Sequence, residues 1–189
     1  RSCQLANLTI SGNSDVQVID STLANLTTTG SKVQAVDSTM AVLTATDSNL
    51  TLAKSTHTTG SITRGQTLYH GSTANADVTI DASDWRAHGS IFKGNLTSTN
   101  ANSKLLKTTV LKGFSHIGAT KDCVVFQSKV GYDSGFVLSS DANRTWVTYS
   151  EVHHAELLGG TEAYIIGNQF ITTTKKEVSS LYLNSSGCE

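Results

Sequence analysis

Apolar and hydroxyl-bearing positions recur along this chain at a fixed spacing, with a step of 17 or 18 at first and of about 20 later. A step of 17 aligns residues 19–33 with 36–50 in identity or chemical character, and a step of 18 aligns 5–12 with 23–30. A fixed short period means that each repeat is one structural unit stacked on the next. The repeat therefore constrains the fold of the whole chain.

Four apolar columns follow a step of 20 in the second half of the chain. They comprise Trp85, Leu105, Val125 and Ile165, with a break at Thr145; Leu106, Phe126, Trp146 and Ile166; Val110, Val130 and Phe170; and Ile117, Val137 and Leu157. In a parallel sheet each column would be a ladder of like side chains spaced ~4.8 Å apart.

The repeat unit is too short for a strand and a crossover helix, which need roughly 30 residues, but it accommodates two or three short strands with tight turns. Proline is absent, as expected where main-chain amides must donate to neighbouring coils. We predict an all-β, single-stranded parallel β-solenoid of roughly ten coils, from the length divided by the periods. It forms one domain over 1–189, with narrow rungs at about 4–75, an irregular changeover at 76–84 and wider rungs at 85–183.

In repeat length and column chemistry the chain resembles the right-handed parallel β-helix proteins, which include pectate-lyase-like enzymes, phage tailspikes and adhesins. The left-handed relatives run on hexads, and neither 17 nor 20 is a multiple of six, so the right-handed form is favoured. A leucine-rich repeat is the competing interpretation. Its consensus occurs in full only once, at residues 5–13, and the spacing lies below the roughly 20–29 residues that this repeat needs.

Composition narrows the function. The 14 basic and 15 acidic residues are evenly spread, which gives no footprint for nucleic acid. No apolar run approaches the length of a membrane-spanning helix, so no membrane span is expected. We expect no cofactor.

Six Asn-x-Ser/Thr sequons favour a secreted, N-glycosylated protein of the cell surface, the extracellular space or a virion, and a viral origin fits the small size. The asparagines are Asn7, Asn25, Asn49, Asn95, Asn143 and Asn184.

Three cysteines, Cys3, Cys123 and Cys188, lie far apart along such a coil. The first and last would be ~45 Å apart, whereas a disulfide needs Cα atoms within ~7 Å. At least one cysteine is therefore expected to link two subunits of a homo-oligomer, with Cys3 or Cys188 the more accessible. The alternative for Cys123 is a buried, inert thiol.

Carboxylates are the first suspects if the protein is a polysaccharide hydrolase or lyase, as many β-helix proteins are. The step of 20 predicts a column of Asp122, Ala142 and Glu162, with the carboxylates roughly 9.6 Å apart, at the limit for an inverting hydrolase. Solvated charges at turns are the competing interpretation.

A second constellation surrounds His153 and His154. The same step places Asp133 beside His153 and Ser134 beside His154, so the columns separate the partners that a catalytic triad must bring to one imidazole. A polar or pH-sensitive ligand patch at His153 and His154 fits better. Together with His116 these residues have no metal-ligand spacing, and no metal site is expected.

Pairs of hydroxyl residues on successive coils suggest ice binding as a further alternative function. Residues 9–11, 27–29 and 44–46 stack into a T-x-T face that resembles the ice-binding face of insect β-solenoid antifreeze proteins, but the pattern stops after three coils. Trp85 and Trp146 are expected in the core, and Tyr69, Tyr132 and Tyr149 at the surface.

The sequence thus predicts a non-enzymatic binding or structural glycoprotein that self-associates and recognises a glycan or a cell-surface receptor. The alternatives are a carbohydrate-active enzyme that uses Asp122, Glu162, Asp133 and His153, and an ice-binding protein.

Overall fold

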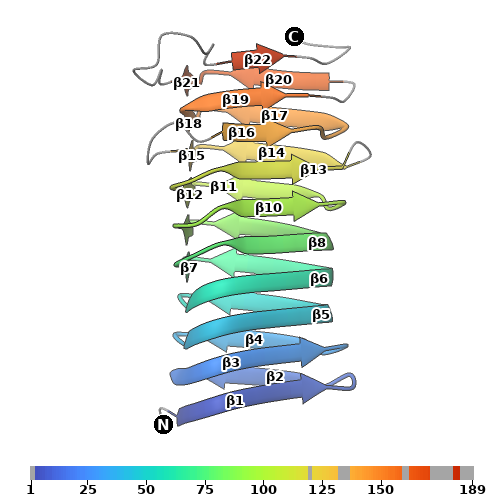
Figure 1. Cartoon of the computed structure of the whole chain (residues 1–189), viewed down its shortest axis with the longest axis vertical. Coiled ribbons are helices and arrows are strands. Elements are labelled where there is room, and N and C mark those ends of the chain that lie inside the picture. Colours follow the sequence, from blue (N-terminus) through green and yellow to red (C-terminus); the bar gives the residue numbers. More distant parts are fainter. Residues whose placement is uncertain (1–2, 119–120, 132–136, 159–161, 171–180, 184–189) are drawn as a thin grey trace.

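The computed structural model describes residues 3–118, 121–131, 137–158, 162–170 and 181–183, with backbone alone at 137, 139 and 181–183. All regular elements in these ranges are β-strands, so the described chain contains no helix that could cross a membrane. The strands form one right-handed coil of about nine turns, each hydrogen-bonded to the turns before and after it (Figure 1). The predicted right-handed parallel β-solenoid is confirmed, and nine turns lie close to the ten expected.

The coil has three faces, and the strands are grouped here by face. The first face holds β1 (Cys3–Ser11), β3 (Ser21–Thr29), the first parts of β5 (Thr39–Ala53), β6 (Thr56–His70) and β8 (Val78–His88), then β10 (Leu96–Thr99), β13 (Phe114–Ile117), β16 (Val137–Ser140), β19 (His154–Leu157) and β22 (Leu181–Leu183). The second face holds β2 (Asp15–Ile19), β4 (Lys32–Val36), the later parts of β5, β6 and β8, then β11 (Ser103–Leu106), β14 (Asp122–Phe126), β17 (Arg144–Thr148) and β20 (Glu162–Ile166). The third face holds β7 (Thr73–Ala74), β9 (Ile91–Phe92), β12 (Thr109–Val110), β15 (Lys129–Val130), β18 (Glu151–Val152) and β21 (Gln169–Phe170).

The register of the first rungs follows the predicted step of 17, because Leu26 pairs with Leu43 and Val33 pairs with Leu50. On the second face the later steps are 18, 20, 22 and 18, so the predicted step of 20 is close to their average but is not constant. Trp85 consequently pairs with Ser103 rather than with Leu105. Further along the chain a step of 22 is followed by one of 18, so residues 40 apart fall in the same column again.

Val125 and Ile165 do share one column, through Val147. The segment at 76–84, expected to be irregular, lies mostly in β8, which continues the register of β6 with a step of 18. The third face becomes separate strands from β7 onward, which is the real change in rung shape.

One corner of the coil is formed by a residue in the left-handed backbone conformation, which is followed in the chain by a serine with a buried hydroxyl. Asp20, Asp37 and Lys54 occupy one corner at successive rungs with φ of 48°, 49° and 50°. The residue after each is a buried serine whose Oγ donates to the carbonyl two residues earlier, as Ser38 does to Val36 at 2.8 Å. From the second of these serines onward, each hydroxyl also accepts the amide of the serine one rung below. The side chains thus satisfy backbone groups that the turn leaves without strand partners.

The interior is a continuous apolar core with a few paired polar side chains. Leu26, Leu43 and Leu96 are fully buried on the first face. One large polar-tipped side chain in the core has a partner there: Trp85 Nε1 donates to Ser98 Oγ at 2.8 Å. The core therefore fixes which side chains point outward, since neighbours in a strand alternate between its two sides.

Candidate functional site

The predicted carboxylate column exists, but with a different residue at its centre. Asp122 pairs with Arg144, and Arg144 pairs with Glu162, on β14, β17 and β20. The middle position predicted for Ala142 is wrong, because the step between β14 and β17 is 22 rather than 20; Ala142 is fully buried instead. The two carboxylates are two rungs apart with a guanidinium between them.

Arg144 engages both oxygens of Asp122. Its Nε lies 3.1 Å from Oδ1 and one terminal nitrogen 2.7 Å from Oδ2, a bidentate geometry. The guanidinium carbon also lies 5.2 Å from the centre of the Trp146 ring. Asp122 could act as an acid or base only by breaking this pair, which makes the column a poor catalytic dyad.

The histidine constellation is not assembled as predicted. His154 pairs with Val137 rather than with Ser134, because the step between β16 and β19 is 17 rather than 20. His154 is nearly buried, with Nε2 at 3.3 Å from Glu156 Oε1, and the His153 amide donates to the Val130 carbonyl at 3.1 Å. Asp133 and Ser134 lie outside the described residues.

His116 is a core residue. Its Nδ1 lies 2.8 Å from the Ser103 hydroxyl, and burial lowers the pKa of the imidazole. Among the described residues no three histidine, cysteine or acidic side chains come together as a metal site would require.

Two of the aromatic assignments are corrected. Trp85 is buried as expected, but Trp146 points outward from β17 because it is out of phase with the core residues Thr145 and Val147. Tyr69, expected at the surface, is fully buried with its hydroxyl 3.1 Å from His57 Nε2. Burial raises the pKa of Tyr69. Tyr149 is 61% exposed as predicted, and Tyr132 lies outside the described residues.

A long groove follows the outer side of the second face. It encloses about 670 Å³ and runs along the stack from β4 to β14. Its lining is rich in amides, hydroxyls and charges: Lys32, Asn49, Leu50, Thr51, Gln66, Thr67, Leu68, Asp84, Trp85, Arg86, Asn102, Lys104 and Asp122.

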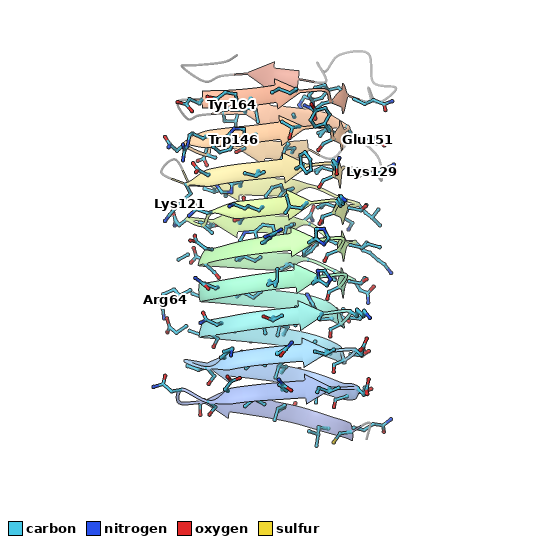
Figure 2. The ribbon with its side chains drawn as sticks, turned by 180° about the vertical axis from the view of Figure 1, so that it is seen from behind. Arg64, Lys121, Lys129, Trp146, Glu151 and Tyr164 are labelled. Atoms are coloured by element: carbon cyan, nitrogen blue, oxygen red, sulfur yellow. The ribbon has the colours of Figure 1, made fainter. Side chains whose placement is uncertain are left out.

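An apolar notch adjoins this groove at Lys104 and Asp122. It measures about 440 Å³ and is further lined by Leu106, Val124, Phe126, Trp146 and Thr148. Figure 2 shows Trp146 and Tyr164 one above the other on this face, and their rings are stacked with centroids 5.7 Å apart and planes 6° apart. Val124 lies next to Trp146 on the preceding rung and is much smaller, so the notch opens beside the indole.

The carboxylates of the groove are already engaged. Asp84 Oδ1 accepts both the amide and the side-chain nitrogen of Asn102 at 3.0 Å, and Asn102 Oδ1 accepts the amide of Asp122 at 3.0 Å. Arg86 and Lys104 follow each other in the next outward column, and within the described chain neither forms an ion pair. Because Asn102 is neutral, Asp84 keeps its negative charge, and the groove presents two cations without ion-pair partners against this one carboxylate.

The asparagines of the sequons and the cysteines differ in their exposure to solvent. Asn7 and Asn49 are exposed, and Asn25, Asn95 and Asn143 are half-buried. Cys3 is exposed on β1, whereas Cys123 is fully buried and burial raises the pKa of its thiol to about 11. Asn184 and Cys188 lie outside the described residues.

Sequence reasoning missed the groove because a constant step of 20 assigned the wrong neighbours to the outward residues of the second face. The outward residues repeat at the same steps as the core, so Arg86, Lys104, Val124 and Trp146 form a readable column once the true register is known. Comparison with known proteins finds no matching family model, no similar curated protein and no similar solved structure.

Proposed function

We propose that this protein is a non-enzymatic, secreted and N-glycosylated binding protein that recognises an acidic oligosaccharide along the groove of the second face. The observation that carries the proposal is the groove, with its amide donors and two cations without ion-pair partners, together with the adjoining notch, where Trp146 and Phe126 lie near Lys104. Aromatic rings, directional amides and a few charges are what a polar ring-shaped ligand needs for binding and orientation.

The charge balance selects the ligand class. Asp122 is neutralised by Arg144, and Asp84 is the one carboxylate of the groove without a cation partner, against two such cations. Arg86 and Lys104 remain to attract anions. A glycan that carries carboxylates or sulfates can form ion pairs with these two cations, whereas a neutral glycan cannot.

A carbohydrate-active enzyme remains the alternative function. It would use Asp122, Glu162, Asp133 and His153, and it requires Arg144 to release Asp122 in the complex. A glycan panel scored for cleavage products as well as for binding separates the two functions. Cleavage abolished by Asp122→Ala or Glu162→Ala would replace the binding proposal with the enzymatic one.

The binding test is calorimetry against neutral, uronic-acid and sulfated oligosaccharides. We expect acidic chains to bind, with affinity falling as salt rises, because the attraction is screened. Trp146→Ala and Lys104→Ala should each weaken binding, the former at least about tenfold as for a buried aromatic anchor. Ile91→Ala removes an exposed apolar side chain of β9 on the third face, outside the groove and the notch, and serves as the control. Equal losses in all three variants, or no acidic preference, would contradict the proposal.

Compartment and self-association are tested together on the protein from a eukaryotic secretory host. We expect glycosidase to increase its gel mobility and reducing agent to convert a covalent dimer to monomer. Cys3→Ser and Cys188→Ser identify the linking thiol. Because Asn49 lines the groove, glycan binding is measured before and after glycosidase treatment. A monomer of unchanged mobility under all conditions would contradict both assignments.

A further inference from the structure

The outer side of the first face carries a two-column array of hydroxyls that extends well beyond the three coils visible in the sequence. One column consists of Thr9, Thr27, Thr44, Ser61, Thr79, Thr97 and Ser115. The column two residues further along each strand consists of Ser11, Thr29, Thr46, Thr63, Asp81, Thr99 and Ile117. The array, called here the threonine face, therefore spans seven rungs from β1 to β13, and its first column is unbroken.

Strand propensity alone does not account for this array. Threonine suits any half-exposed strand, so propensity would distribute it over both large faces. The corresponding outward columns of the second face run through Gln17, Gln34, Thr51, Leu68, Arg86, Lys104, Val124, Trp146 and Tyr164, and through Ile19, Val36, Ala53, His70, His88, Leu106, Phe126, Thr148 and Ile166. Each of these columns contains a single threonine. The hydroxyls are segregated to one side of the coil.

The hydroxyls of the threonine face are free to bond water. From β1 to β10 the structure gives none of them a hydrogen bond to another protein group among the described residues, in contrast to the inward serines of the corners. All of these side chains are exposed or half-buried. Asp81 is the only ionisable residue in the two columns.

The spacing of the array is regular in both directions. Successive rungs lie ~4.8 Å apart, and residues two positions apart along a strand lie ~6.6 Å apart. Figure 1 shows the strands of this face from β1 to β10 stacked in line, and the buried core holds them there.

We propose that the threonine face binds ice. Threonine presents a hydroxyl that fixes a water position and a methyl group that orders the water around it. A rigid two-dimensional lattice of such groups holds a sheet of ordered water, which can merge with the water layers of a crystal. A flexible or charged surface cannot do this, because its own solvation competes with a regular arrangement.

The sequons mark one border of this face. Asn7 and Asn25 lie two residues before Thr9 and Thr27, and Asn25 Nδ2 donates to Asn7 Oδ1 at 2.5 Å. The sequon Asn95 lies in the same way two residues before Thr97, so glycans on these three asparagines would overhang β1, β3 and β10 and leave β5, β6 and β8 clear. The full chain is therefore tested without glycans, after bacterial expression, and with glycans.

The test measures partition of the protein into a growing ice hemisphere, together with thermal hysteresis. We expect the wild type to enter the ice and Thr44→Tyr to lose this property, because one bulky ring lifts the flat face off the crystal. Thr79→Tyr, two rungs away, should behave in the same way. Gln34→Tyr places the same ring on the second face and should retain full ice partition. Circular dichroism and melting temperature confirm folding of each variant.

Exclusion of the wild type from ice, or an equal loss for Gln34→Tyr and Thr44→Tyr, would overturn the proposal. So would binding by the threonine face to crystalline cellulose or chitin without ice partition, since the occupant would then be a polysaccharide crystal. The result is independent of the groove: Trp146→Ala should retain ice partition, and Thr44→Tyr should retain acidic glycan binding.

Discussion

The main-chain amide of Ser38 donates to the side-chain oxygen of Ser55, one rung further along the coil, at 3.1 Å. Ser55 Oγ in turn donates to the Ala53 carbonyl at 3.0 Å, and both serines are at most 2% exposed. The same arrangement recurs from Ser55 to Ser72 and from Ser72 to Ser90. A buried serine ladder thus supports one corner of the solenoid along much of its length.

Ser55→Ala should lower the free energy of unfolding by about 1–3 kcal/mol, because it leaves the buried amide of Ser38 without an acceptor. Urea denaturation followed by circular dichroism measures the change. Ser61→Ala makes the same substitution on the outside of the coil, where an effect within about 0.5 kcal/mol is expected. Equal effects at the two sites would show that the ladder contributes nothing specific.

Gly65→Ala should destabilise the protein more than Gly30→Ala. Both glycines have positive φ, of 109° and 61°, so both substitutions strain the backbone. At Gly65 an added Cβ would also lie 2.1 Å from the Ser48 carbonyl oxygen, whereas at Gly30 no atom lies within 4 Å. Thermal melts compare the variants, and a larger loss for Gly30→Ala would contradict this packing argument.

His57 should make the protein acid-sensitive. Burial lowers its pKa from 6.5 to about 4, so the unfolded chain takes up a proton in a range where the folded chain does not. The free energy of unfolding should therefore fall as pH drops from 6.5 to 4, by about 3 kcal/mol from this residue, and level off below. His57→Gln offers an amide to Tyr69 but does not titrate. The free energy of unfolding of the His57→Gln variant should vary less between pH 6.5 and 4 than that of the wild type. The same dependence on pH in both proteins would contradict the assignment.

The two described thiols should differ in reactivity. Cys3 is exposed, whereas Cys123 is buried with its thiol pKa raised to about 11, which leaves little thiolate near neutral pH. In a Cys188→Ser background, after reduction and removal of the reductant, iodoacetamide at pH 8 should modify Cys3 in the native protein and Cys123 only after unfolding. Peptide mass spectrometry distinguishes the two sites. Rapid native labelling of Cys123 would mean that the core opens at β14.

Much of the architecture followed from the sequence because a stacked fold repeats its chemistry at the interval of one turn. The pairings of Leu26 with Leu43 and of Leu105 with Val125 were both predicted from that interval. The prediction failed where loops changed length: two additional residues before Arg144 moved it into the position assigned to Ala142. A period averages over such insertions, whereas hydrogen bonding between rungs fixes each register separately.

The sequence by itself determined that the chain is a parallel β-solenoid, since only strands joined by tight turns fit so short a repeat. The tertiary structure alone decided which side chains share a surface. Outward positions tolerate any polar residue and so carry a weak periodic signal, yet their arrangement created both the groove beside Trp146 and the seven-rung threonine face. The core pattern defines the coil, and the register of each turn decides what its outer surface can bind.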